Sequence, residues 1–304
     1  MEILVIGSFM MDLVVRTPRA PENGETLIGT SFSIFPGGKG ANQAVSSARL
    51  GGKVTMVGKV GIDHFGDQAL DALNKENVNT QYILRDSEIP TGVGSVTLEE
   101  NGDNRIIVVP GANLNFTIDE LENIKHLIMN AKVIVLQLEM DLKMVEQAIA
   151  YAADYEVPII FNPAPAQKLS DEVLSKISYL TPNETEAEIL TGVTINSIED
   201  AKTAGKILIE KGVKNVIMTL AEKGALVVNQ SRAYHVPGFP VHPVDSVAAG
   251  DSFNGALAVG IVSGKTLEEA VKFANAVGAL TVTKEGAIPS LPSLEEVELF
   301  LTHV

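Results

Sequence analysis

The sequence contains no cysteine and no tryptophan, and only 5% of its residues are aromatic. Without cysteine, disulfides, thiolate zinc sites and a cysteine nucleophile are excluded, and the cytoplasm is the default location. No run of about 18 uncharged apolar residues occurs, so we expect no membrane span. The start, "MEILVIGSFMMDL", lacks a basic segment and indicates a first strand instead of a signal peptide.

Positive charge is also scarce, because 23 Lys and Arg face 38 Asp and Glu, giving a net charge of −15 at pH 7. A sequence-independent nucleic-acid binder needs a basic surface, so we expect no nucleic-acid partner. An anionic substrate such as ATP would have to be held locally, by backbone NH groups, a few lysines and a divalent metal. The 304 residues, 45% of them hydrophobic, are sufficient for one domain with a sizeable core.

Short apolar runs alternate with helical patterns along the chain. Strands are predicted at 3–7, 54–61, 133–139, 158–162, 216–220 and 225–229. Helices are predicted near 40–50, 64–76, 118–130, 142–154, 199–211, 251–263 and 266–283. Because such alternation is typical of crossover helices, we expect an α/β fold with a mostly parallel sheet covered on both faces.

Two segments, 13–35 and 91–110, break this alternation, since they have strand-like patterns without an intervening helix. They predict an antiparallel flap beside the main body. A flap of this kind can act as a lid that closes over a site and expels water. An edge extension or a dimer contact would explain the pattern too.

A glycine-rich loop precedes the helix predicted near 40–50. Gly37, Gly38 and Gly40 would allow the backbone to approach a ligand closely. The loop is not a Walker A motif, and no dinucleotide fingerprint follows the first strand. A tight connection would explain the glycines, but Lys39 and Asn42 favour ligand contact because both can hydrogen-bond to hydroxyl groups.

Polar residues elsewhere have both a structural and a functional interpretation. Asp12 follows a buried strand, where ligands gather in α/β sheets, and could hold two vicinal hydroxyls or simply form a turn. Asn183 and Glu186 have the spacing of a helix capping box. They could also organise a hydrated Mg²⁺ and phosphate, because Mg²⁺ prefers oxygen ligands and keeps several waters.

The stretch "DSVAAGDSFNGAL" combines two acids with small residues at a predicted helix start. The first turn of a helix has free NH groups, and Ala248, Ala249 and Gly250 would leave them open to a transferring phosphoryl group. Asp251 lies in that turn, where the helix dipole favours its carboxylate. It could take a proton from an attacking hydroxyl, or merely cap the helix. Asp245 could hold a cation or form a salt bridge.

The motifs "GGKGANQA", "NPAPA", "PNETEAE" and "DSVAAGDSFNGAL", in this order, resemble the ribokinase branch of the PfkB sugar-kinase family, over about residues 3 to 292. The resemblance implies a ribokinase-like three-layer α/β sandwich with a small antiparallel β lid. It implies ATP-dependent phosphorylation of the 5-hydroxyl of D-ribose, with Mg²⁺ as the divalent metal and K⁺ as an activating monovalent cation. It also implies homodimers whose flap strands pair across the interface.

The resemblance also implies roles for individual residues. The family base matches Asp251, and the anion hole matches Ala248, Ala249 and Gly250. The sugar contacts match Asp12, Gly38, Lys39, Gly40, Ala41, Asn42 and Glu139. The nucleotide contacts match Asn183, Thr219, Leu220, Ala221, Glu222, Lys223, Gly224, Gly250 and Asn275, with Glu186 associated with Mg²⁺ and phosphate. The monovalent-cation loop matches Asp245, Val247, Thr281, Lys284, Gly286 and Ser290.

Met10 departs from the family pattern, because ribokinases usually carry there an asparagine that reads sugar hydroxyls. A thioether offers an apolar contact instead. Losing a hydroxyl partner should weaken the preference for ribose over 2-deoxyribose. Deoxyribokinase-like relatives also show methionine at this place, so phosphorylation of 2-deoxyribose, or of another furanose or a nucleoside, is the alternative.

Two smaller departures are Ala221, where the nucleotide loop often has glycine, and Val247, where the cation loop often has threonine. A non-catalytic sugar sensor on the same fold is a further alternative. Such a sensor would be expected to lose the base or the anion hole, and both are present here.

Overall fold

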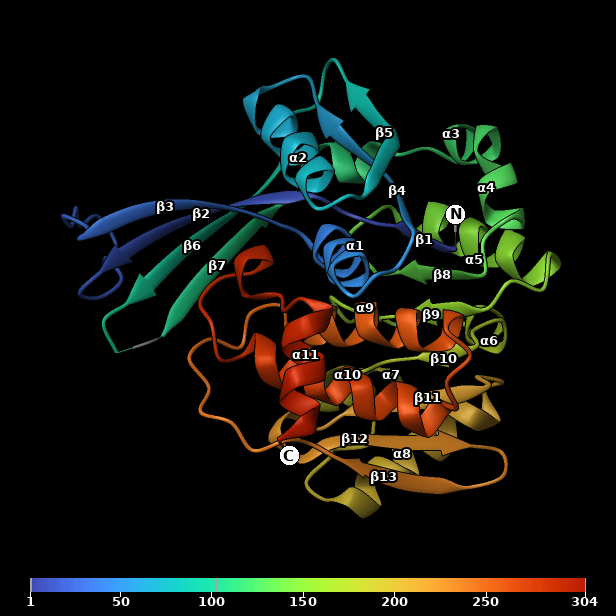
Figure 1. The fold of residues 1–304 in the computed structure, drawn as a ribbon. Coiled ribbons are helices and arrows are strands. Elements are labelled where there is room, and N and C mark those ends of the chain that lie inside the picture. Colours follow the sequence, from blue (N-terminus) through green and yellow to red (C-terminus); the bar gives the residue numbers. More distant parts are fainter. Residues whose placement is uncertain (1, 102, 304) are drawn as a thin grey trace.

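The computed structural model describes residues 2–101 and 103–303, and a nine-stranded sheet forms the centre of the larger part (Figure 1). Its strands are β1 (Ile3–Ile6), β4 (Val54–Gly61), β5 (Asn79–Asp86), β8 (Val133–Leu136), β9 (Ile159–Phe161), β10 (Tyr179–Leu180), β11 (Asn215–Thr219), β12 (Gly224–Asn229) and β13 (Ala233–Pro237). The order is β13-β12-β11-β10-β9-β8-β1-β4-β5. Only the β11–β12 and β12–β13 pairs are antiparallel, so the predicted mostly parallel sheet is confirmed.

Helices cover both faces of this sheet. They are α1 (Lys39–Arg49), α2 (His64–Lys75), α3 (Ile118–Asn123), α4 (Lys125–Met129), α5 (Leu142–Asp154), α6 (Asp171–Ser175), α7 (Glu184–Thr191), α8 (Ile198–Glu210), α9 (Ala249–Val262), α10 (Leu267–Thr281) and α11 (Leu294–Thr302). None of the helices described is long and apolar enough to cross a membrane.

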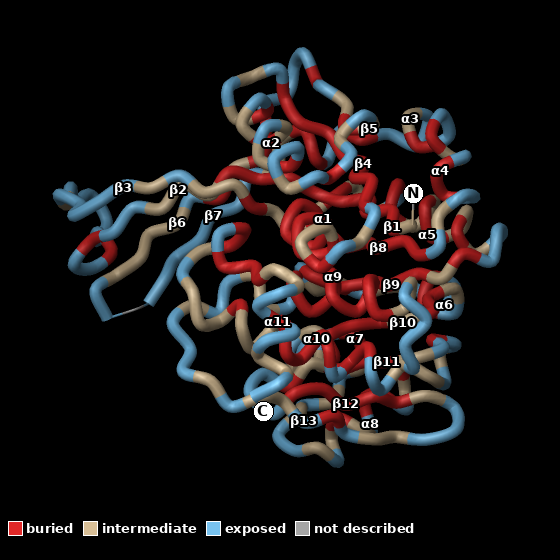
Figure 2. The backbone as a smooth tube through the Cα atoms, viewed as in Figure 1, coloured by how far each residue is buried: buried red, intermediate tan, exposed pale blue. Residues whose placement is uncertain are grey.

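Strand β1 shows why the sheet needs two helical layers. Its residues alternate between the two faces, as in any strand. Ile3 and Val5 belong to one apolar cluster, which includes residues of α1, α9 and α10. Leu4 and Ile6 belong to a second cluster, which includes residues of α5, α7 and α8. All four are fully buried, and Figure 2 shows the central strands as a continuous buried band. A strand that is apolar on both sides is stable only between two covered faces.

The segments predicted as a flap form a separate four-stranded sheet that projects from the main body (Figure 1). Its order is β3 (Ser31–Gly37), β2 (Met10–Thr17), β6 (Gly92–Glu99) and β7 (Asn104–Val109). Residue 102, within the second predicted segment, lies outside the described residues. The outer pairs are antiparallel as expected, but β2 and β6 pair in parallel. This follows because β2 and β6 both leave the parallel main sheet, after β1 and β5, in the same direction.

The remaining differences from the predicted elements concern short or half-exposed segments. The helix predicted near 118–130 is two short helices, α3 and α4. Strand β5 was missed because its burial alternates, and β10 has only two residues. The sequence patterns also missed β13, α6 and α11.

Candidate active site

The carboxyl edge of the main sheet carries a row of buried polar side chains. Gln137, Asn162 and Thr181 each directly follow the last residue of β8, β9 and β10, and Ser8 lies two residues after β1. These four strands are neighbours, so the side chains form a continuous polar row where ligands gather in α/β sheets. The sequence patterns predict no role for any of them. The signal that could have identified these residues in the sequence is a polar residue at the end of an apolar strand.

Asp251 is buried above this row, in the first turn of α9. Its Oδ2 accepts a hydrogen bond from Asn42 Nδ2 (2.9 Å), and its Oδ1 accepts one from Gln43 Nε2 (2.9 Å). Helix α9 has Ala248 at its N-cap and no side-chain cap. The structure therefore does not support helix capping by Asp251. It places the carboxylate between two amide donors.

The start of α9 is open to an anion. Ala248 adopts a left-handed conformation (φ 61°), which turns the chain sharply into the helix. Among the described residues, no acceptor pairs with the backbone NH groups of Gly250 or Asp251. A Cβ added to Gly250 would meet no atom within 4 Å, so the first turn of α9 is uncrowded beside Gly250. Free NH groups at the positive end of a helix form an anion site.

Four acids and one lysine form a charged cluster at this edge of the sheet. Burial, together with the charges of Glu139 and Asp251, raises the pKa of Asp12 to about 6. Burial alone would lower the pKa of Lys39, but the charges of Asp251, Glu139 and Glu186 outweigh it and raise that pKa. Lys39 is therefore a fixed cation at the centre of the acidic cluster.

The glycine loop packs directly on the end of β1. Gly38 has a positive φ (93°), and a Cβ on Gly40 would lie 2.5 Å from Ser8 N. Glu139 Oε2 accepts hydrogen bonds from Lys39 N (3.0 Å) and Ser8 Oγ (2.5 Å). Burial raises the pKa of Glu139, although Lys39 and Ser8 oppose the shift. The glycines thus serve a tight connection and also bring α1, with Ala41 and Asn42, to the site.

Asp12 reaches the site from the small sheet and lies within β2, not at the exit of β1 as expected. Its two neighbouring strands make room for it, because a Cβ at Gly37 would lie 2.7 Å from Oδ2 and one at Gly94 would lie 2.5 Å from Oδ1. Within the described residues its carboxylate accepts no hydrogen bond. Met10, two residues earlier on the same face of β2, is buried.

Asn183 and Glu186 form the predicted capping box at the start of α7. Asn183 Oδ1 accepts from Glu186 N (2.8 Å), and Glu186 Oε2 accepts from Asn183 N (2.9 Å). Burial raises the pKa of Glu186, and the charge of Asp251 adds to this rise. The charge of Glu186 in turn raises the pKa of Lys39. Asn183 also pairs with Thr219 through an isolated β-bridge. The capping role and proximity to the candidate site therefore coexist.

The loop from Thr219 to Gly224 lies against the end of β13. It contains the single-turn helix Ala221–Lys223, with positive φ at Ala221 (49°) and Gly224 (95°). Lys223 O accepts from Gly238 N (3.2 Å). Asn275 Nδ2, on α10, donates to Val236 O (3.0 Å) and Pro237 O (3.1 Å). The structure thus gathers Asn183, the 219–224 loop and Asn275 at the ends of β11 to β13, while the remaining predicted nucleotide residue, Gly250, is at the start of α9. The conformation of Ala221 explains why glycine is common at this position.

Asp245 joins the two segments of the predicted cation loop. Its Oδ1 accepts from Val247 N (3.0 Å) and its Oδ2 from Gly286 N (2.9 Å). The carbonyl oxygens of Val247 and Gly286 accept no hydrogen bond in the described part of the chain. One carboxylate near free carbonyls is a donor set that fits a hard monovalent cation. Three side chains of the predicted set bond elsewhere, namely those of Thr281, Lys284 and Ser290.

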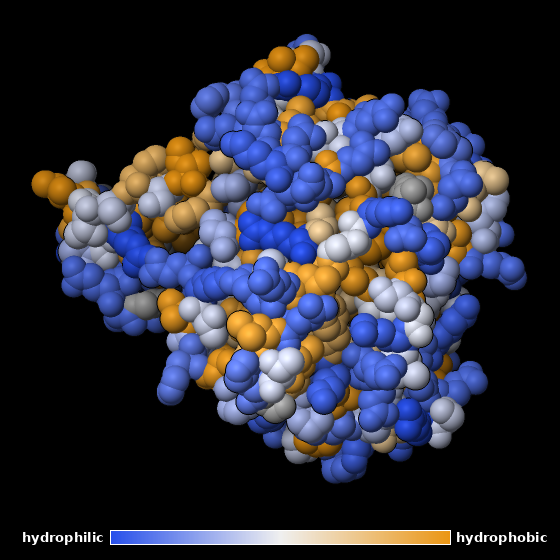
Figure 3. All heavy atoms as spheres, in the orientation of Figure 1, coloured by the Kyte–Doolittle hydropathy of each residue, from blue (hydrophilic) through white to orange (hydrophobic). Residues whose placement is uncertain are grey.

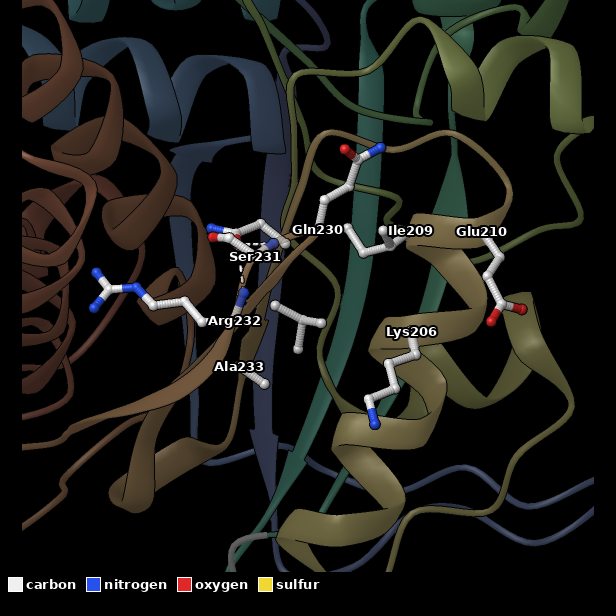
Figure 4. Close-up of a pocket in the computed structure, with 9 residues that line it drawn as sticks. Lys206, Ile209, Glu210, Gln230, Ser231, Arg232 and Ala233 are labelled. Carbon is white, nitrogen blue, oxygen red and sulfur yellow. Dashed lines mark hydrogen bonds between the residues drawn. The ribbon is translucent and has the colours of Figure 1, made fainter.

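The described residues contain no group of three or more acid or histidine side chains that could hold a metal ion alone. A surface hollow of about 250 Å³ lies elsewhere, between α8 and the β12–β13 turn (Figure 4). Lys206, Ser231 and Arg232 are among its lining residues. Because β12 runs from Gly224 to Asn229, this hollow lies at the opposite end of the strand from the 219–224 loop. It is therefore separate from the candidate site.

The fold and the site together define a class of protein. A mostly parallel α/β sheet presents an acid at an open helix start, and a small sheet brings a second acid to it, as expected of an α/β sugar kinase. The chain belongs to the pfkB family of carbohydrate kinases, which matches residues 1–294.

Individual relatives cover nearly the whole chain. A ribokinase of Bacillus subtilis is 42% identical over 300 residues, or 99% of each chain. A deoxyribokinase of Salmonella typhi is 38% identical over 303 residues, again 99% of each chain. The structure of Arabidopsis thaliana ribokinase complexed with ribose and ATP matches with a TM-score of 0.92 at 33% identity, covering 99% of this chain and 98% of that chain. The ribokinase-like fold is thereby confirmed.

Proposed function

We propose that this protein transfers the γ-phosphoryl group of ATP to the 5-hydroxyl of D-ribose, giving ribose 5-phosphate and ADP. The observation that carries the proposal is the buried carboxylate of Asp251 directly beside the unpaired NH groups of Gly250 and Asp251. A base and an anion site must be adjacent for an alcohol to attack a phosphoryl group. The ribokinases of Bacillus subtilis and Arabidopsis thaliana support ribose as the acceptor.

In the proposed mechanism, Asp12 and Asn42 hold the sugar. The Oδ1 of Asn42 is buried and has no hydrogen-bond partner among the described residues, so it can accept from a sugar hydroxyl. Asp251 takes the proton of the primary hydroxyl as that oxygen attacks the γ-phosphorus. The NH groups at the start of α9 stabilise the charge on the transferring group. The small sheet acts as a lid that keeps water from ATP.

Two cations are part of the proposal. Mg²⁺ would be held mainly by the ATP phosphates and waters, with Glu186 as a single nearby carboxylate, and would neutralise charge on the phosphates. K⁺ would bind Asp245 and the carbonyl oxygens of Val247 and Gly286, with further carbonyls from Thr281, Lys284 and Ser290. Because this loop leads directly into α9, a cation there would fix the position of the anion site. ATP and Mg²⁺ are both supplied in the cytoplasm, which is the proposed location.

A second candidate substrate is 2-deoxyribose. Met10 is buried on the same face of β2 as Asp12, so its thioether lies where the family asparagine would read a hydroxyl. A site without that hydrogen-bonding group has no polar atom to leave unpaired when the hydroxyl is absent. The 38% identity to a deoxyribokinase of Salmonella typhi supports 2-deoxyribose as this second candidate.

We further propose that two copies of the chain associate through their small sheets. The sheet exposes apolar side chains on both faces, at Val15, Phe32, Ile34, Ile106, Ile107, Val108 and Val109. Apolar spheres gather on this projection in Figure 3. Exposed patches of this kind commonly mark interfaces.

The successive residues Ile106 and Ile107 lie on opposite faces of β7, so Ile106→Glu and Ile107→Glu each place a charge on one face. We expect at least one of them to shift a dimer to monomer in sedimentation velocity. A dimer that survives both substitutions would contradict pairing through this sheet.

A coupled ADP-release assay over pentoses and hexoses, with and without K⁺, tests the proposed activity. We expect ribose or 2-deoxyribose to give the highest kcat/KM, and removal of K⁺ to lower kcat. Sugar binding without ADP release from any of these sugars would contradict the proposal and favour a sugar sensor.

A further inference from the structure

A chain of three side-chain amides, from Gln137, Gln43 and Asn162, lies directly behind Asp251. Gln137 Nε2 donates to Gln43 Oε1 (2.7 Å), and Gln43 Nε2 donates to Asp251 Oδ1 (2.9 Å). Gln43 Nε2 also donates to Asn162 Oδ1 (3.3 Å), and Asn162 Nδ2 donates to Thr181 O (3.2 Å). Within this amide chain, only Gln43 contacts Asp251.

The two outer amides select one orientation of Gln43. An amide side chain has an oxygen that accepts and a nitrogen that donates, so it could turn either end towards a carboxylate. Gln137 presents a donor to Gln43 Oε1, and Asn162 presents an acceptor to Gln43 Nε2. Both contacts therefore require the nitrogen of Gln43 to face Asp251, which is the only orientation that attracts the carboxylate.

Gln137 itself is an unfavourable residue for its position. Its Oε1 is buried and has no hydrogen-bond partner in the described part of the chain. This oxygen fills the space that Gly7 leaves open by having no Cβ, since a Cβ there would lie only 2.2 Å away. Leaving a buried carbonyl oxygen unpaired is costly, and an apolar side chain of the same shape would avoid the cost. The amide of Gln137 is explained by the single hydrogen bond that it donates to Gln43.

We propose that Gln137 and Asn162 are positioning residues that act through Gln43 to fix Asp251 Oδ1, so that Oδ2 is the atom that takes the proton. Oδ2 also contacts Asn42, one of the proposed sugar ligands, and so lies on the sugar side of the carboxylate. In the step itself, the O–H bond of the sugar breaks, its proton passes to Oδ2, and the freed electron pair forms the new bond to the γ-phosphorus. The bond from that phosphorus to the bridging oxygen of ATP breaks at the same time, and its electron pair leaves with ADP. This inference rests on the proposed function.

A double-substitution cycle on kcat tests the amide chain. We expect Gln43→Met to lower kcat by about 10²-fold and Gln137→Met by about tenfold, with both KM values within about twofold, because a misplaced base slows the chemical step more than binding. Gln137 acts only through Gln43, so Gln137→Met should cause no further loss in the Gln43→Met background. Losses that simply multiply in the double variant would overturn the proposal.

Ser47→Ala is the matched control. Ser47 is buried on the same helix and donates to Gln43 O (2.8 Å) and Gly255 O (3.2 Å), but its side chain does not contact the amide chain. We expect a lower melting temperature and near wild-type kcat. A kcat loss as large as that of Gln137→Met would show that general loosening of α1 explains the effect, and would overturn the proposal.

If Gln43→Met does not fold, Gln137→Glu tests the same contact, because it keeps the shape but removes the donor to Gln43 Oε1. We expect about a tenfold lower kcat, and wild-type kcat would overturn the proposal. Asp251→Asn, measured beside these variants, distinguishes failure of the proposed function from failure of the amide-chain proposal. If Asp251→Asn retains turnover, the proposed function fails. If Asp251→Asn alone loses turnover while all amide-chain variants keep it, only the amide chain fails.

Discussion

The two acids of the site, Asp251 and Asp12, occupy very different surroundings. Asp251 is buried on the main body, and each of its oxygens accepts a hydrogen bond from a side-chain amide. Asp12 lies on the small sheet, makes no hydrogen bond within the described residues, and has an elevated pKa of about 6. The Asp251 carboxylate is therefore held in place before substrate arrives, whereas the small sheet carries a carboxylate with no hydrogen-bond partner among the described residues.

This contrast suggests that the main body and the small sheet have different roles in the reaction. Electrostatic stabilisation of a phosphoryl transfer is most effective when the groups are already oriented, as they are around Asp251. Choice of the acceptor depends on which hydroxyls satisfy unpaired polar groups. On the small sheet the unpaired group is the Asp12 carboxylate, and its neighbour Met10 offers only an apolar contact. Substitutions on the body should thus alter turnover, and those on the small sheet should alter sugar selection.

The largest effect is expected for Asp251→Asn. The substitution keeps the shape but removes the base, so kcat should fall by about 10²–10⁴-fold. Sugar affinity, measured by isothermal titration calorimetry, should stay close to that of the wild type. Turnover within tenfold of the wild-type value would remove Asp251 from its proposed role.

A smaller and pH-dependent effect is expected for Asp12. Above pH 6 the carboxyl group is mostly ionised and can accept from two sugar hydroxyls; below pH 6 it is protonated and one acceptor is lost. The kcat/KM for the sugar should therefore fall as the pH drops through about 6. Asp12→Asn should lower kcat/KM by about 10–100-fold and remove this dependence, because hydrogen bonds to a charged group are lost.

The measurement is kcat/KM for the sugar from pH 5 to 8, in the wild type and in Asp12→Asn. The KM for ATP serves as the control and should not respond to Asp12→Asn. If kcat/KM for the sugar falls at acidic pH in Asp12→Asn as it does in the wild type, protonation of Asp12 does not cause the fall.

The smallest effect is expected for Met10→Asn. Adding a hydrogen-bonding group should raise the ratio of kcat/KM for ribose to that for 2-deoxyribose by about tenfold. Met11→Leu is the matched control, because Met11 is buried on the opposite face of the same strand and its replacement should leave the ratio unchanged. An unaltered ratio in Met10→Asn would show that Met10 does not read the sugar.

The sequence predicted the parts of this arrangement that depend on local patterns. Alternating apolar runs located the central strands, and the spacing of Asn183 and Glu186 predicted a capping box that the structure contains. Small residues before Asp251 predicted an open helix start. Each of these features is determined by residues a few positions apart.

The parts that were missed depend on distant pairs. Gln43 and Asp251 are 208 positions apart, and Gln137 lies 94 positions from Gln43, so no local pattern reveals that they touch. Strand β10 was missed because two residues cannot show a period. The placement of Asp12 on β2 depends on Gly37 and Gly94, whose role appears only when three strands lie side by side.

A crystal structure of the protein with ribose and a non-hydrolysable ATP analogue tests the central claim most directly. We expect the terminal phosphate to accept hydrogen bonds from the NH groups of Gly250 and Asp251, and Asp251 Oδ2 to face the 5-hydroxyl of the sugar. A terminal phosphate bound away from the start of α9, with the Asp251 carboxylate turned from the sugar, would contradict the account.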